Sequence, residues 1–251
     1  MNPYIGHETQ LSGVEEHRLV GGKGDGMRLY EATNGKGLEL TLSPDRNGDI
    51  TRLRYKGINM SYFSPCGYVA PAYYDKVGAN WLQSFTAGFL TTCGLQAVGT
   101  PCIDDGEELP LHGSIANQPC AQSYWEEDDK EIRIHSVTKD EVIFDRKLVL
   151  KRTVTISKEE NTFSIDDHIE NTGSKTEPME ILYHMNMGYP LLDEDSEVTI
   201  HRWKSGHVMI MLRRTLQTGC IWKNHRAIIR KDVIIINLKD PMEKQVFISL
   251  N

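Results

Sequence analysis

Hydrophobic and polar residues alternate along several short stretches of the chain. The clearest are residues 37–44, 131–137, 142–157 and 162–173, and each is bounded by Gly, Asn, Asp or Pro. A period of two residues is typical of strands that bury one face. The sequence SKEEN at 157–161 predicts a hairpin turn, and residues 80–90 predict no more than a short helical segment. Repeated short strands with close turns therefore predict an all-β protein whose antiparallel sheets pack face to face.

The overall composition excludes several classes of partner. The 251 residues carry 28 Lys and Arg against 35 Asp and Glu, a formal net charge of -7, which does not favour binding to nucleic acid or to an anionic membrane. The sequence has no apolar run long enough to span a bilayer, and its first ten residues lack the pattern of a signal peptide. Five cysteines without paired or metal-type spacing fit a reducing compartment. We therefore expect a cytoplasmic globular protein.

The charge is unevenly distributed along the chain. Residues 201–251 contain ten Lys and Arg and three Asp and Glu, which leaves 18 and 32 respectively for residues 1–200. The alternation of apolar and polar positions also stops there. The sequence therefore predicts a β-sandwich domain over residues 1–200 and an atypical basic tail over residues 201–251.

Two histidines stand in short motifs with glycine and asparagine. The stretch YHMNMGYPLL at 183–192 places His184 and Asn186 on one face of a predicted strand, with Gly188 leaving room beside them. His112 lies in LHGSIANQP at 111–119. A single histidine in a strand is usually a hydrogen-bonded structural residue, but two in similar motifs indicate a functional site.

These motifs resemble those of a known family. The stretches at 37–50, 55–67, 87–119 and 183–196 occur in the order found in the aldose-1-epimerase-like family of unknown function, within the galactose mutarotase-like superfamily. The resemblance covers residues 4–200. It implies a large antiparallel β-sandwich, the galactose mutarotase-like supersandwich, with a sugar-sized cleft on one sheet. It implies no cofactor, because the reaction of such enzymes is proton transfer alone.

The resemblance also assigns roles to the histidines. Interconverting the anomers of an aldose requires an acid that protonates the ring oxygen and a base that deprotonates the anomeric hydroxyl. By motif, His184 corresponds to the acid and His112 to the histidine that binds the sugar. Asn186 and Asn117 then either bind sugar hydroxyls or brace loops through backbone hydrogen bonds.

Four further side chains have two interpretations each. Arg46 and Asp49 in PDRNGDI either bind hydroxyls as a charged pair or form a turn with a surface ion pair. Trp81 either stacks on a sugar face or packs in the interior. Cys93 in TTCGL has no neighbouring activating group in the sequence, which favours a buried structural thiol over a nucleophile. The acidic runs at 104–108 and 126–130 lack the spacing of a calcium loop, so we predict no metal site.

The chain departs from the family pattern in two places. Ser114 follows the HG of the first motif where the family usually has arginine, and the late glutamate that acts as the base has no counterpart. A shift of reading frame near residue 201 would explain the missing glutamate, because the codons of Trp222 and Lys223 encode Glu in the alternative frame. The sandwich would then be incomplete at its C-terminus. The competing interpretation is a divergent C-terminal extension, and sequencing of the encoding DNA distinguishes the two.

Together these features predict a carbohydrate-binding protein that resembles aldose 1-epimerases. We expect a small-molecule sugar or sugar derivative as its partner, and acid/base interconversion of anomers with His184 as the acid. The alternatives are a carbohydrate-binding protein without catalysis and an inactive, truncated remnant. The sequence specifies neither the sugar nor the oligomeric state.

Overall fold

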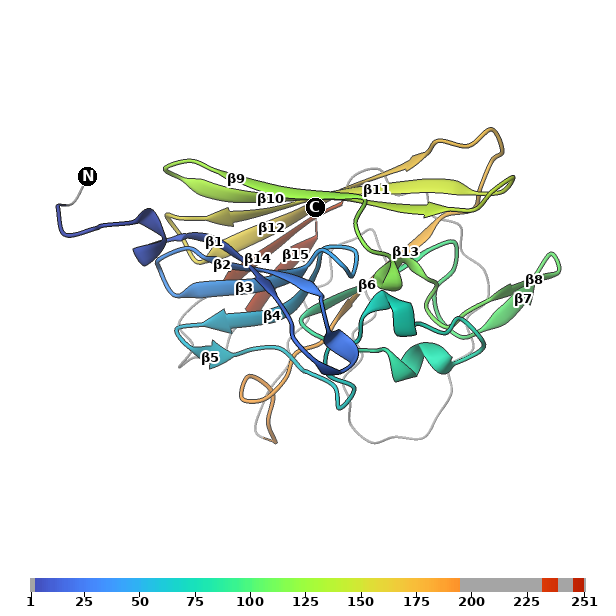
Figure 1. Ribbon diagram of the computed structural model, residues 1–251, viewed down its shortest axis with the longest axis horizontal. Coiled ribbons are helices and arrows are strands. Elements are labelled where there is room, and N and C mark those ends of the chain that lie inside the picture. Colours follow the sequence, from blue (N-terminus) through green and yellow to red (C-terminus); the bar gives the residue numbers. More distant parts are fainter. Residues whose placement is uncertain (1–2, 195–231, 239–245, 251) are drawn as a thin grey trace.

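The computed structural model describes residues 3–194, 232–238 and 246–250. Its strands are antiparallel and form two main sheets, which confirms the predicted all-β class (Figure 1). The first sheet has the order β1-β2-β3-β4-β5. Its strands are β1 (Gly13–Arg18), β2 (Arg28–Thr33), β3 (Leu38–Ser43), β4 (Asp49–Tyr55) and β5 (Ile58–Asn59).

The second sheet has the order β15-β14-β12-β11-β10-β9. Its strands are β9 (Gln122–Glu127), β10 (Glu131–Glu141), β11 (Lys147–Ser157), β12 (Thr162–Asn171), β14 (Asp232–Leu238) and β15 (Val246–Leu250). Two smaller ribbons pair β6 (Leu90–Leu95) with β13 (Glu180–Met185), and β7 (Cys102–Asp104) with β8 (Glu107–Leu109). Short 3-10 turns complete the described fold: η1 (Glu8–Gln10), η2 (Gly22–Gly24), η3 (Pro71–Tyr73), η4 (Asn80–Gln83) and η5 (Ile115–Asn117).

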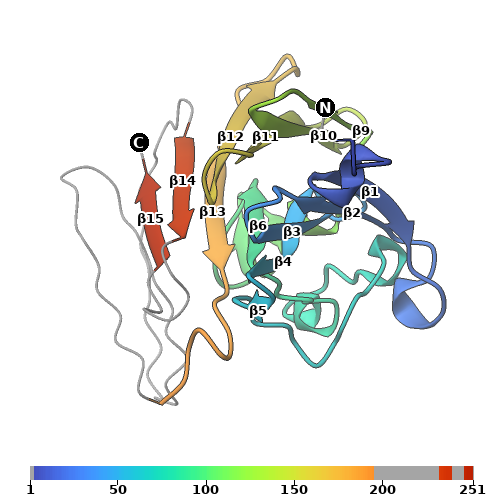
Figure 2. The ribbon, with the colours of Figure 1, turned by 90° about the vertical axis from the view of Figure 1, so that its left-hand side faces the viewer.

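The hydrophobic core lies between the inward faces of the two main sheets, which stack as separate layers in Figure 2. Leu38, Leu40 and Leu53 of the first sheet belong to the same buried cluster as Val154 and Ile165 of the second. The alternation seen in the sequence is the alternation of these inward positions with exposed ones, as in the burial pattern of β10. Burial of such side chains, at roughly 1.5–3 kcal/mol each, is the main stabilising contribution to the sandwich.

The predicted hairpin at 157–161 is confirmed, since β11 ends at Ser157 and β12 begins at Thr162. The predicted strand at 142–157 is too long by five residues. Residues 142–146 form the turn before β11 instead, because Phe144 adopts a left-handed backbone (φ 63°) and the amide of Val142 donates to the carbonyl of Arg146. The apolar sequence VIF therefore forms an exposed hairpin tip, a position that the apolar pattern alone does not reveal.

A buried network of charges fastens the β6–β13 ribbon to both sheets. The guanidinium of Arg152 on β11 donates to Asp49 of β4 (2.7 Å), to Asp167 of β12 (2.6 Å) and to the hydroxyl of Thr92 on β6 (2.9 Å). The hydroxyl of Tyr183 on β13 donates to Asp167 (3.0 Å). The guanidinium therefore joins β4, β6, β11 and β12, and β13 joins the same network through Asp167, which fixes where the ribbon lies.

The basic tail predicted for residues 201–251 falls mostly outside the described residues. From that segment the structure describes β14 and β15, which extend the second sheet from β12. The reading-frame hypothesis and the domain boundary at residue 200 remain predictions. Among the described residues, no helix is both long and apolar enough to cross a membrane.

Candidate functional site

The structure brings the imidazoles of His112 and His184 together from separate parts of the chain. Their ring centroids are 5.6 Å apart and their planes are nearly perpendicular, at 84°. Both side chains are half-buried, so neither is sealed in the core. Two partly exposed rings that touch each other edge to face can both reach one small molecule lying over them.

Alternation along β13 explains why His184 points away from the core. Its neighbours Tyr183 and Met185 pack against the buried cluster between the sheets. A strand places successive side chains on opposite faces, so His184 lies on the other face, where its ring meets the edge of Phe85 at 5.6 Å. The amide of Asn186 donates to the His184 carbonyl (3.0 Å), and Asn186 is therefore positioned beside the histidine as a brace for its backbone.

Backbone hydrogen bonds hold His112 in an unusual conformation. It has a left-handed φ of 58°, and its amide donates to the carbonyl of Gly99 (2.9 Å) while its carbonyl accepts from the amide of Gly94 (3.0 Å). Gly113 follows with φ of 71°, and a methyl group there would overlap the Gly94 carbonyl and lie 2.6 Å from that of Ala97. The glycine of the HG motif is thus required by close backbone approach, and that approach fixes the imidazole.

The hydrogen bond to its Nδ1 determines which nitrogen of His112 carries the proton. The amide of Gly99 donates to Nδ1 (3.3 Å), so the neutral ring is protonated at Nε2 and presents that group as a donor. Burial, with a smaller contribution from the charge of His184, lowers the pKa of His112 to about 4. Burial also lowers the pKa of His184, opposed by the amide of Asn186. Both rings are therefore mainly neutral near pH 7.

Trp81 and Asn117 are both buried and do not lie on an open surface. Trp81 is 1% exposed, stacks on Phe85 at 4.4 Å and presents its edge to His112 at 5.0 Å. It therefore packs under the site, and no face is left for a sugar. Asn117 is also buried and accepts from the hydroxyl of Ser84 (3.2 Å), while its amide nitrogen has no hydrogen-bond partner among the described residues.

Arg46 and Asp49 correct the sequence-based expectation, because both are buried and form neither a surface ion pair nor a hydroxyl-binding pair. Asp49 accepts from the backbone and hydroxyl of Thr92 (2.9 and 2.6 Å) as well as from Arg152. Arg46 donates to the carbonyl of Val69 (2.9 Å), and burial lowers its pKa to about 10. Turn-forming residues predicted a surface loop here, but most residues of this loop are buried.

Two smaller expectations have clear outcomes. Gly188 does not make room for a ligand beside the histidines. It allows the backbone at Ser61 to approach, because a methyl group at Gly188 would lie 2.6 Å from the carbonyl carbon of Ser61. Cys93 is fully buried, and burial raises the pKa of its thiol, as expected for a structural residue. No cluster of His, Cys, Asp and Glu with metal-ligand geometry occurs among the described residues.

Sequence reasoning missed two contributors to the site. Phe85 touches both Trp81 and His184, and its only sequence signal is an aromatic residue four positions after a tryptophan. In the sequence, Arg152 and Asp167 are only polar positions of alternating strands, and nothing there relates them to Asp49. Their meeting is a consequence of strand packing that no local pattern reports.

Solved structures with the same architecture define the class of fold. A "putative aldose 1-epimerase" from Klebsiella pneumoniae has 29% sequence identity and a TM-score of 0.66, covering 72% of this chain and 49% of that chain. A galactose mutarotase-like protein from Clostridium acetobutylicum has 16% identity and a TM-score of 0.50, covering 75% of this chain and 57% of that chain. The fold is therefore galactose mutarotase-like. This chain spans about half the length of these structures.

The family follows from the sequence match. The model of a domain of unknown function (DUF4432) matches residues 24–207, which is more than half of the chain, and the chain belongs to this family. No curated protein matches it.

Proposed function

We propose that this protein binds the ring form of an aldose or an aldose derivative against His112 and His184. We further propose that His184 exchanges a proton with the ring oxygen as the ring opens and closes. The observation that carries the proposal is the approach of two half-buried imidazoles to 5.6 Å in a galactose mutarotase-like fold. The Klebsiella protein named for aldose 1-epimerase activity supports the same class of ligand.

The two rings suit different tasks. With Nδ1 of His112 occupied by the Gly99 amide, its Nε2 donates to a sugar oxygen, and it cannot accept a proton in that tautomer. His112 is thus suited to binding the sugar. His184 has a lowered pKa, so its protonated form is a strong acid for the ring oxygen, although it is a minor species at pH 7.

The proposed reaction conserves atoms and charge. The bond between the anomeric carbon and the ring oxygen breaks as His184 gives its proton to that oxygen, while a base takes the proton of the anomeric hydroxyl. The open-chain aldehyde then rotates and recloses with the proton transfers reversed. The base is a separate requirement, since His112 acts as a donor.

A second candidate is sugar binding without catalysis. It is favoured by one observation: no ion pair between described residues includes His112 or His184, so no carboxylate of that part of the chain lies within ion-pair distance of either imidazole. The two candidate functions use the same binding residues and differ in whether the protein accelerates the equilibration of sugar anomers.

Nuclear magnetic resonance with pure α-anomers of several aldoses distinguishes the candidates. Catalysis predicts faster equilibration than in buffer, and His184→Ala should abolish the acceleration while saturation-transfer signals from bound sugar persist. The exposed His168 provides the control, since His168→Ala should keep the parent rate. Binding signals without acceleration would support the second candidate. The absence of both signals in the folded protein would refute sugar binding.

A further inference from the structure

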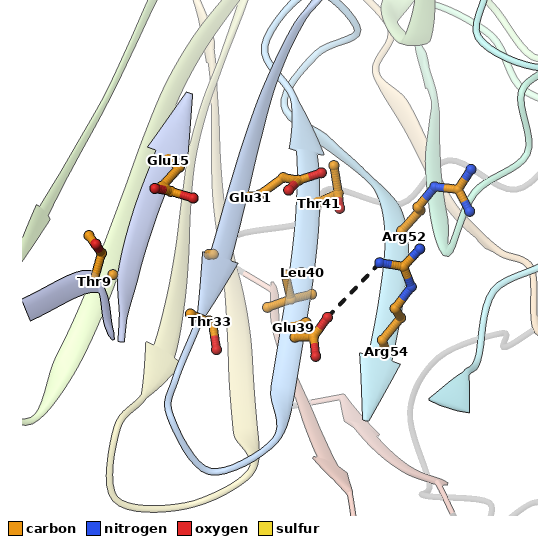
Figure 3. Close-up of a pocket in the computed structure, with 11 residues that line it drawn as sticks. Thr9, Glu15, Glu31, Thr33, Glu39, Leu40, Thr41, Arg52 and Arg54 are labelled. Carbon is orange, nitrogen blue, oxygen red and sulfur yellow. Dashed lines mark ion pairs between the residues drawn. The ribbon is translucent and has the colours of Figure 1, made fainter. Parts of the chain in front are cut away.

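The outward face of the first sheet carries an ordered pattern of charge. Register partners form two rows across β1 to β4: Glu15, Glu31, Thr41 and Arg52 in one, and Gly13, Thr33, Glu39 and Arg54 in the other. Figure 3 shows the glutamates on β1, β2 and β3 and both arginines on β4. A depression of about 320 Å³ lies over these rows. The face is thus acidic at one side and basic at the other.

Within one chain these charges are poorly compensated. Glu15 and Glu31 are directly opposed across β1 and β2, and like charges in that position destabilise a sheet. Their only ion-pair neighbour among the described residues is His17, at 3.9 and 3.6 Å, which is charged only when protonated. Arg52 forms no ion pair with the part of the chain that the structure describes, and its guanidinium lies 4.4 Å above the ring of Phe63. Arg54 pairs with Glu39 at 4.0 Å, and Arg52 also lies 5.9 Å from the ring of Tyr68. The charges without a permanent counter-charge among the described residues are therefore those of Glu15, Glu31 and Arg52.

We propose that a second copy of this chain covers this face, related by a two-fold axis that runs parallel to the strands between β2 and β3. A rotation about this axis places each row of one copy over the same row of the other copy, with the order of the strands reversed. Glu15 of one copy then faces Arg52 of the other, and Glu31 lies over the position of Thr41, which is buried in its own chain. In the second row Gly13 leaves room for the arginine opposite. The surface is self-complementary, as a two-fold interface requires.

The rows favour a second copy over a small ligand. A small molecule in the depression would meet carboxylates and guanidiniums that lie several strands apart, whereas reversing the first row places Glu15 opposite Arg52 twice, once in each direction across the interface. Three six-residue strands and β4, spaced about 4.8 Å apart with about 3.4 Å per residue, give roughly 400 Å² for each copy. An interface of this size with charged contacts is weak and sensitive to salt.

Charge reversal tests the pairing directly. Sedimentation equilibrium at about 20 mM salt, where screening is weak, should show a monomer–dimer equilibrium for the parent. Glu15→Arg and Arg52→Glu should each weaken dimerisation roughly tenfold, because two facing pairs become repulsive. The double variant should restore it. An equimolar mixture of the two single variants should form heterodimers, since both facing pairs are then attractive.

A charge-reversal control on the other sheet separates this interface from general effects of net charge. Lys151→Glu on β11 reverses an exposed lysine of the other sheet and should leave dimerisation unchanged. A parent that stays monomeric at low salt would overturn the proposal. Failure of both the double variant and the mixture to recover dimers, with circular dichroism showing folded chains, would overturn it as well.

Discussion

Replacing His112 with glutamine should make the protein less sensitive to acid. The folded chain lowers the pKa of His112 from about 6.5 to about 4, chiefly through burial. When the pKa of a histidine is lower in the folded chain than in the unfolded chain, the group does not affect stability at a pH above the unfolded-chain pKa. At a lower pH the unfolded chain binds a proton that the folded chain does not, so the free energy of unfolding falls between about pH 6.5 and pH 4.

The magnitude follows from these two values. At pH 5 the difference in protonation corresponds to about 2 kcal/mol of lost stability. The ring is partly exposed, and solvent screening reduces the expected loss to about 1 kcal/mol. Urea unfolding at pH 7.5 and pH 5 measures the free energy of unfolding under each condition.

The comparison between variants isolates the histidine from other titrating groups. The parent and the exposed-site control His168→Gln should both lose about 1 kcal/mol more than His112→Gln between the two pH values. Equal losses in all three proteins would refute the argument that burial holds this imidazole neutral. A larger loss of stability in His112→Gln than in the parent would show that the pKa of His112 is raised in the folded chain and not lowered.

Two further substitutions test the contacts that position the site. Gly113→Ala should destabilise the protein by several kcal/mol, because the methyl group would overlap the Gly94 carbonyl in a left-handed backbone. The control Gly21→Ala, with φ of 83° and open space around it, should cost only about 1 kcal/mol. Thermal unfolding compares the two variants, and equal losses of stability would contradict the close backbone approach at Gly113. Arg152→Met should lower the free energy of unfolding by about 3–5 kcal/mol, because it leaves two buried carboxylates without a counter-charge. The control Lys151→Met, at an exposed site, should change it by less than about 1 kcal/mol. If urea unfolding shows an equally small effect for Arg152→Met, the network does not anchor the ribbon.

Local patterns in the sequence identified several of the strands and one hairpin. Alternation over 131–137 and 162–173 corresponds to β10 and β12, and the polar stretch 157–161 is the turn between β11 and β12. These predictions succeed because the pleat imposes a period of two and turns require particular backbone angles. Both causes act within a few residues, so one segment of sequence is enough to show them.

The approach of the histidines could be predicted only through the family resemblance. His112 and His184 are 72 residues apart in the sequence, and no spacing rule relates them. Their meeting depends on the antiparallel pairing of β13 with β6 and on the backbone bonds that hold the HG turn beside β6. A motif can name such residues, but packing decides their distance.

The sequence by itself determined an acidic, all-β chain with several of its strands and one hairpin turn, since hydrophobic period and turn chemistry are local properties, and its motifs named two candidate histidines. Only the tertiary structure decided which polar residues are buried together. It moved Asp49 from an expected surface turn into a network with Arg152, placed Trp81 beneath the imidazoles, and aligned glutamates and arginines of four strands into opposed rows. The physical reason is that burial, pairing of charges and strand register depend on segments far apart in the chain, which become neighbours only when the sheets form and pack.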